Sequence, residues 1–133
     1  MLDSRPALAT TMTSSTLINQ GDLYWLEPQE VSDLGSAQRH PYVVVQDDVF
    51  NHSRITTTVV CALTTNLHRA TEPGNIPLEP GEGSLPKPSV IVVSQVLSVH
   101  KAQLGLKIGE LSASRVQQVL DGLRFQQRSF FAP

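Results

Sequence analysis

Short apolar runs separated by turn-forming residues constrain the fold of this chain more than any other feature. The runs at 23–26, 43–46, 55–63 and 90–93 are rich in β-branched, aliphatic or aromatic residues. Such residues favour strands, and weaker extended segments follow at 96–99 and 107–111. Because Val43-Val44-Val45 is apolar without alternation, we expect the second strand to be buried on both faces. The chain is therefore predicted to be mainly β.

The segments between these runs carry the residues that form turns. Residues 27–40 are predicted to form a loop, and Asp47-Asp48, Asn51 and Ser53 mark a turn over 47–54. The stretch 71–89 is dense in proline and glycine, so we expect loop there, with at most a short edge strand near 76–78.

The apolar period changes near the C-terminus. Four apolar residues at helical spacing form one stripe, and Ser112 stands where an N-cap belongs; the stripe is Val116, Val119, Leu120 and Leu123. Gly122 lowers helix propensity by about 1 kcal/mol relative to alanine, so packing must hold this helix. We predict a small β-barrel with one C-terminal helix over residues 18–127, flanked by tails at 1–17 and 128–133.

Length and charge exclude several classes of protein. The chain has 133 residues, enough for one domain, and a net charge of −2, so any contact with nucleic acid must come from a local patch. Basic residues for such a patch fall within one central stretch: Arg39, His40, His52, Arg54, His68 and Arg69. No apolar run reaches the ~18 residues of a membrane helix, and no secretory signal is recognised. A cytoplasmic protein without membrane contact is predicted.

No metal or cofactor is expected from the sequence. The histidines are scattered, and Cys61, the single cysteine, lies in an apolar run where a buried, inert thiol is predicted. No P-loop, dinucleotide-binding glycine pattern or nucleophile elbow is present.

The strongest candidate for chemistry is the pair Arg39-His40, which ends at Pro41 and leads into the second strand. If strands two and three pair antiparallel through the turn at 47–54, the start of one lies beside the end of the other. His40 and Thr64 then become neighbours. A guanidinium, an imidazole and a hydroxyl at one corner can bind a phosphate and move a proton. RNA supplies its own nucleophile, the 2′-hydroxyl, so these groups suffice to cleave it without metal.

Each of these residues also has a purely structural interpretation. Arg39 and His40 are compatible with a solvated loop, and Thr64 with a cap at a strand end. Gln95, at the end of a buried run, is compatible with a structural amide that satisfies backbone groups.

The order and spacing of several stretches resemble the MazF/PemK family of toxin endoribonucleases. The resemblance runs from Gly21 to about Phe125 and is carried by residues 21–25, 35–38, 41–48, 59–64, 90–95 and the helix after Gly109-Glu110-Leu111-Ser112. It implies an SH3-like barrel of the CcdB/PemK type that forms a homodimer. It also implies metal-independent, sequence-specific cleavage of single-stranded RNA to 2′,3′-cyclic phosphate and 5′-hydroxyl ends, and a cognate antitoxin as partner.

Several residues match positions with a role in this family. Thr64 matches the catalytic threonine, and the resemblance assigns the substrate site to Ser36, Gln38, Gln46, Thr65 and Gln95. One departure concerns the family's arginine before the proline, because His40 stands there and Arg39 precedes it. We expect Arg39 to take the phosphate and His40 the proton.

Two other interpretations remain open on sequence alone. The first is a non-catalytic barrel that binds or inhibits a protein partner, as a related fold inhibits DNA gyrase. The second is a plain SH3-like interaction module, which would need an exposed aromatic cluster for peptide docking.

Overall fold

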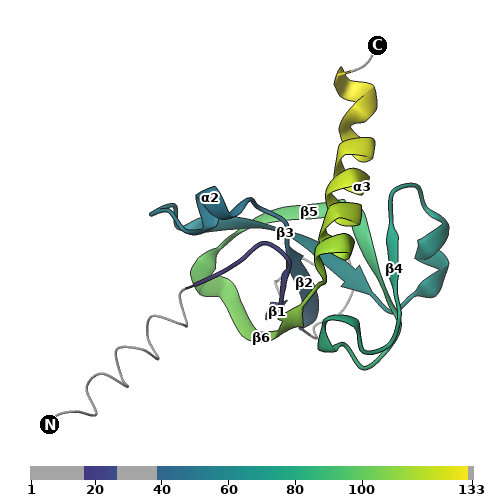
Figure 1. Ribbon diagram of the computed structural model, residues 1–133, viewed down its shortest axis with the longest axis horizontal. Helices are drawn as coiled ribbons and strands as arrows, with labels where there is room; N and C mark the ends of the chain where they lie inside the picture. The colour runs from purple at the N-terminus through teal and green to yellow at the C-terminus, as the bar shows by residue number, and fades with distance from the viewer. Residues whose placement is uncertain (1–16, 27–38, 132–133) are drawn as a thin grey trace, which may run out of the picture.

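The computed structural model describes residues 17–26 and 39–131, and Figure 1 shows a curled sheet with one long helix. The strands are β1 (Asp22–Leu26), β2 (His40–Val44), β3 (Thr57–Thr64), β4 (Ile76–Leu78), β5 (Ser89–His100) and β6 (Leu104–Glu110). The helices are α2 (Asp48–Asn51) and α3 (Ala113–Phe131), with 3-10 turns η1 (Leu67–Thr71), η2 (Glu82–Ser84) and η3 (Lys101–Gln103). The predicted mainly β fold with a terminal helix is confirmed.

The strands form one antiparallel sheet in the order β4-β5-β3-β2-β1-β6. Its two edges approach each other, because η2 follows edge strand β4 and packs against edge strand β6. Gly109 and Gly83 meet there so closely that a side chain on Gly109 would strike the Gly83 backbone. This curl fits the predicted SH3-like barrel.

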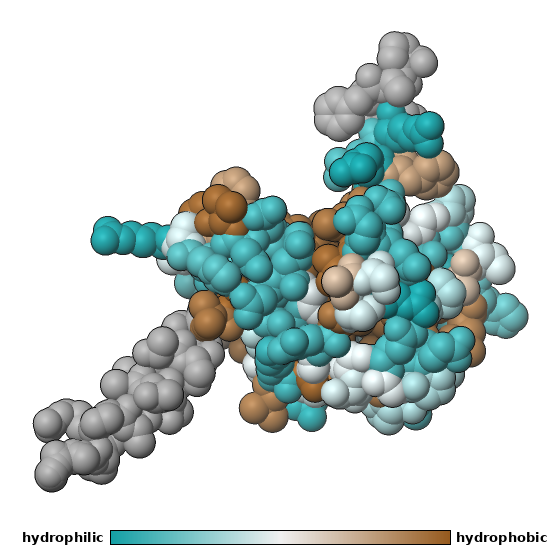
Figure 2. Space-filling model, viewed as in Figure 1, coloured by the Kyte–Doolittle hydropathy of each residue, from teal (hydrophilic) through white to brown (hydrophobic). Residues whose placement is uncertain are grey.

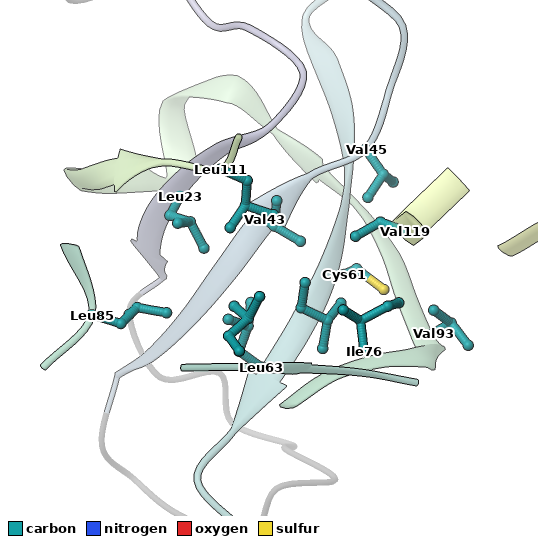
Figure 3. Close-up of a cluster of buried hydrophobic side chains, with 12 residues drawn as sticks. Leu23, Val43, Val45, Cys61, Leu63, Ile76, Leu85, Val93, Leu111 and Val119 are labelled. Atoms are coloured by element: carbon teal, nitrogen blue, oxygen red, sulfur yellow. The ribbon is translucent and has the colours of Figure 1, made fainter. Parts of the chain in front are cut away.

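The core has two parts, one on each face of the central strands. Figure 3 shows the larger cluster, in which Val43, Cys61 and Leu63 lie near Val119 of α3. The second cluster, on the other face, includes Val44 and Val60. Adjacent residues of β2 thus enter different clusters, which confirms that this strand is buried on both faces.

Cys61 is fully buried. This confirms the predicted burial, and burial raises the pKa of the thiol to about 12, which disfavours the reactive thiolate.

Four elements differ from the sequence prediction. Strand β2 spans His40–Val44, whereas we predicted loop through residue 40 and the strand at 43–46. The turn predicted over 47–54 contains the one-turn helix α2, whose first turn is capped by the Asp47 side chain accepting from Val49 N at 2.8 Å. The run predicted to end at Ser94-Gln95 continues as β5 to His100, with an irregularity in its pairing to β3. Helix α3 continues to Phe131, beyond residue 127 where we predicted the domain to end.

Gly122 has a packing role that its low helix propensity hides. It lies against the backbone of Gly74, and a side chain on Gly122 would strike the Gly74 carbonyl oxygen. Helix α3 can therefore approach the loop before β4 only because residue 122 lacks a Cβ. Figure 1 shows the C-terminal part of α3 projecting beyond the sheet. Within residues 17–26 and 39–131, no helix is long and apolar enough to cross a membrane.

Candidate active site

The ladder between β2 and β3 sets the position of the candidate pair. Tyr42 pairs with Ala62 and Val44 with Val60, so continuing the register by two residues places His40 opposite Thr64. On its other side His40 pairs with Leu26 of β1. Side chains that lie directly opposite each other in an antiparallel pair share a face of the sheet. The observed antiparallel pairing of β2 with β3 is the one that the prediction assumed, and the approach of His40 to Thr64 stays a prediction.

Two buried polar side-chain atoms, one on β2 and one on β5, have no hydrogen-bond partner. They are Nε2 of His40 and Oε1 of Gln95, the only such side-chain atoms in the part of the chain that the structure describes. Leaving a buried polar atom unpaired costs roughly 1–3 kcal/mol, so the few that occur often serve a function. Both atoms therefore keep unused hydrogen-bonding capacity.

Thr64 ends β3 and is half-buried. Its Oγ1 accepts a hydrogen bond from the backbone N of Asn66 at 3.1 Å, which uses an oxygen lone pair. Because a hydroxyl is both donor and acceptor, the Thr64 proton is available for a second partner. The backbone bond fixes the hydroxyl in a position to donate.

Gln95 reaches the site through the irregularity in β5. The register moves from Cys61 opposite Val96 to Ala62 opposite Val92, so residues 93–95 are extra on the β5 side. Such a bulge re-aims side chains and is frequent beside active sites. It places Gln95 next to Ala62, about 7 Å along β3 from Thr64 at ~3.3 Å per residue.

Arg39 does not join His40 and Thr64 as predicted. Its guanidinium carbon lies 4.8 Å from the ring centroid of Trp25, a cation–π contact. Trp25 pairs with Pro41 across β1 and β2, on the face of the sheet opposite to His40. The physical reason is strand alternation, since successive residues point to opposite faces.

The other predicted site residues divide into three groups. Gln46 lies at the far end of β2 from His40, and its Nε2 donates to Asn51 Oδ1 at 3.0 Å and to Thr57 O at 3.1 Å. Its assignment to the substrate site is therefore wrong, because its side chain supports the loop before β3. Thr65 follows Thr64 and is exposed. Ser36 and Gln38 lie outside the described residues.

Sequence reasoning missed Tyr42. It lies two residues after His40 on the same face of β2, between Tyr24 of β1 and Ala62 of β3, and it is half-buried. The spacing in the sequence could have predicted this, because residues i and i+2 of a strand share a face and Tyr42 is two residues after His40. Among the described residues, no group of three histidine, cysteine or carboxylate side chains is arranged to hold a metal ion.

Together these residues offer an imidazole, a positioned hydroxyl donor and an amide on three neighbouring strands. An imidazole can take and return a proton near neutral pH. A hydroxyl aimed at developing negative charge stabilises a transition state. The arrangement can support proton transfer and charge stabilisation at a phosphodiester.

The family model and the relatives that match the chain all point to one protein family. Residues 19–126 match the family described as PemK-like, MazF-like toxin of type II toxin–antitoxin system. Endoribonuclease MazF6 of Mycobacterium tuberculosis is 33% identical over 108 residues, covering 81% of this chain and 95% of the relative. Endoribonuclease MazF of Staphylococcus epidermidis is 31% identical over 109 residues, covering 80% and 88%.

Solved structures agree on the fold. MazF of Deinococcus radiodurans superposes with a TM-score of 0.66 at 17% identity, over 84% of this chain and 97% of the other. A mycobacterial endoribonuclease in complex with its cognate antitoxin gives 0.65 at 21% identity, over 87% and 97%.

Proposed function

The chain belongs to the PemK-like, MazF-like family of type II toxin–antitoxin toxins, and we propose that it is an endoribonuclease that cleaves single-stranded RNA. One observation of its structure supports this most. His40 begins β2 and Thr64 ends the neighbouring strand β3, and His40 and Gln95 each carry a buried side-chain atom without a partner. Bound RNA would give both atoms a partner.

In the proposed reaction the RNA provides the nucleophile. His40 accepts the proton of the 2′-hydroxyl, O2′ bonds to the phosphorus, and the bond from phosphorus to O5′ breaks. The departing O5′ takes a proton from water, and the His40 imidazolium returns its proton to the solvent, which leaves a 5′-hydroxyl and a 2′,3′-cyclic phosphate. A positioned acid–base group of this kind contributes about 10²–10⁴ in rate.

Thr64 would stabilise the charge that develops on the phosphate. Its hydroxyl proton points to a non-bridging oxygen, while the Asn66 backbone holds the oxygen in place. Gln95 offers an unpaired amide oxygen that can accept from a base or a ribose hydroxyl. Thr65 adds an exposed hydroxyl next to Thr64. Ser36 and Gln38 complete the proposed substrate site.

We also propose the partners that the family implies. A cognate antitoxin would block the RNA site, as a structural neighbour was solved with its own antitoxin. A homodimer is supported by exposed apolar side chains on three elements, namely Val49 and Phe50 on α2, Val96 on β5 and Phe125 on α3. Figure 2 shows such a hydrophobic patch over α2. The site of action is the cytoplasm, where messenger RNA is found.

The test uses the purified protein and a long single-stranded RNA in the presence of a chelator. We expect cuts at defined sites, with 2′,3′-cyclic phosphate on one side and 5′-hydroxyl on the other. Replacing the nucleotide 5′ to one mapped cut by its 2′-deoxy form should abolish that cut alone. Intact RNA at high protein concentration would instead favour the non-catalytic, partner-binding interpretation.

A further inference from the structure

A groove lies at the end of β3 that is remote from Thr64. Residues 17–18, 51–56 and 100–102 line it, and its volume is about 560 Å³. We call this surface the basic groove, because four of its lining side chains are His52, Arg54, His100 and Lys101. None of the residues that line it is acidic.

The pairing of β3 with β5 assembles the groove from segments far apart in the sequence. Thr57 pairs with His100, and Lys101 N donates to Thr56 O at 2.7 Å. Lys101 Nζ also donates to the Asn51 carbonyl at 2.7 Å, which holds the ammonium at the groove. Both sides of the groove are therefore tied to the sheet.

Two of the basic side chains in the groove, Arg54 and Lys101, are not neutralised by the described part of the protein. In the described part of the chain, Arg69, Lys107 and Arg115 each form an ion pair with a carboxylate. Neither Arg54 nor Lys101 has a carboxylate within ion-pairing distance there.

The carboxylate that approaches the lining residue His52, Asp48, is already engaged. Asp48 Oδ1 accepts from Gln20 N at 2.6 Å and lies 3.9 Å from His52 Nε2. On a chain with a net charge of −2, unpaired cations gathered in one groove mark a local site for a polyanion.

From this geometry we propose that the basic groove binds the phosphate backbone of the same single-stranded RNA that is cleaved at His40 and Thr64. This inference rests on the proposed function. Thr57, at the groove, and Thr64 are seven residues apart on β3, which is ~23 Å at ~3.3 Å per residue. The groove therefore cannot take part in the chemistry, and it acts by holding a longer RNA.

The chemistry of the lining predicts how the groove reads RNA. No phenylalanine, tyrosine or tryptophan lines the groove, and the ring of His52 is already hydrogen-bonded to Asn19, so we expect recognition to go mainly through phosphates. Leu17 and Ile55 add half-exposed apolar surface at the groove. Binding there should be independent of sequence and sensitive to salt.

The experiment measures binding of a long, uncleavable 2′-O-methyl RNA by fluorescence anisotropy at several salt concentrations. The test variant is Arg54→Gln/Lys101→Gln, and the matched control is Arg54→Lys/Lys101→Arg, which keeps both charges. Each phosphate contact on a single strand contributes about 0.7 to the slope of log K against log salt. Losing two contacts should make the slope of the Gln variant less steep by about 1.4. The ratio of wild-type to variant affinity should therefore be about 25-fold larger at ~0.1 M salt than at ~1 M.

Cleavage kinetics on a long RNA separate binding from chemistry. The Gln variant should show a raised KM at every cut site with kcat unchanged, and the charge-preserving control should match the wild type. Thermal unfolding of both variants checks that the fold is intact.

Three results would overturn the proposal. The first is a wild type that cleaves RNA together with a Gln variant whose RNA affinity and salt slope are unchanged. It refutes RNA binding at the basic groove and leaves the proposed function standing. A wild type that neither cleaves nor binds RNA refutes both. A Gln variant that loses binding of a polyglutamate peptide but keeps its RNA affinity assigns the groove to an acidic peptide.

Discussion

Replacing Thr64 by valine removes a hydroxyl and little else. Valine keeps the β-branched shape that suits the end of β3, and within the described residues Thr64 Oγ1 accepts one hydrogen bond, from the exposed Asn66 backbone N. Water can replace that acceptor, so the free energy of unfolding should change by no more than about 1 kcal/mol. If the hydroxyl donates to the phosphate in the transition state, its loss should lower kcat about 10²–10³-fold, equivalent to about 2.7–4 kcal/mol.

The assay for Thr64→Val is single-turnover cleavage of an end-labelled RNA with a chelator present, at saturating protein. Thr64→Ser is the control, because it keeps the donor and should stay within about tenfold of the wild type. Urea unfolding of both variants confirms that stability is preserved. A valine variant that cleaves at the wild-type rate would show that the Thr64 hydroxyl stabilises no charge in this reaction.

Three further predictions concern the scaffold. Cys61, with its raised pKa, should resist iodoacetamide in the native protein at mildly alkaline pH and react once urea unfolds the chain. The Arg115 guanidinium lowers the pKa of Glu82, so the ion pair stabilises the fold above the ordinary glutamate pKa of about 4.3. That contribution is lost as pH falls through the lowered folded-state pKa, and the stability gap between wild type and Glu82→Gln in urea unfolding should shrink with it. Gly122→Ala gains about 1 kcal/mol of helix propensity yet should lower Tm by calorimetry, because its Cβ strikes the Gly74 carbonyl.

Local pattern was enough to predict most of the elements. The β-branched runs and the helical stripe define β1, β2, β3 and α3, and even the short strand β4 lies at 76–78 as predicted. The course of β5 could not be predicted in this way. Ser94 and Gln95 look like a strand end by composition, and only pairing with β3 shows that the strand continues through an irregularity to His100.

The candidate site shows the same division between local and long-range information. The antiparallel pairing of β2 with β3 follows from a hairpin and could be predicted. The position of Arg39 was predicted wrongly, because strand alternation sends it to Trp25 rather than to His40. Gln46 was misplaced since its partners form only after α2 folds back on β3.

The most direct test of the account is chemical rescue of a variant that lacks the imidazole of His40. We predict that His40→Ala slows cleavage at a mapped site about 10²–10⁴-fold. Added free imidazole should restore part of that rate at the same site, with the same cyclic phosphate end. A His40→Ala protein that cuts as fast as the wild type without imidazole would contradict the proposal that His40 moves the proton.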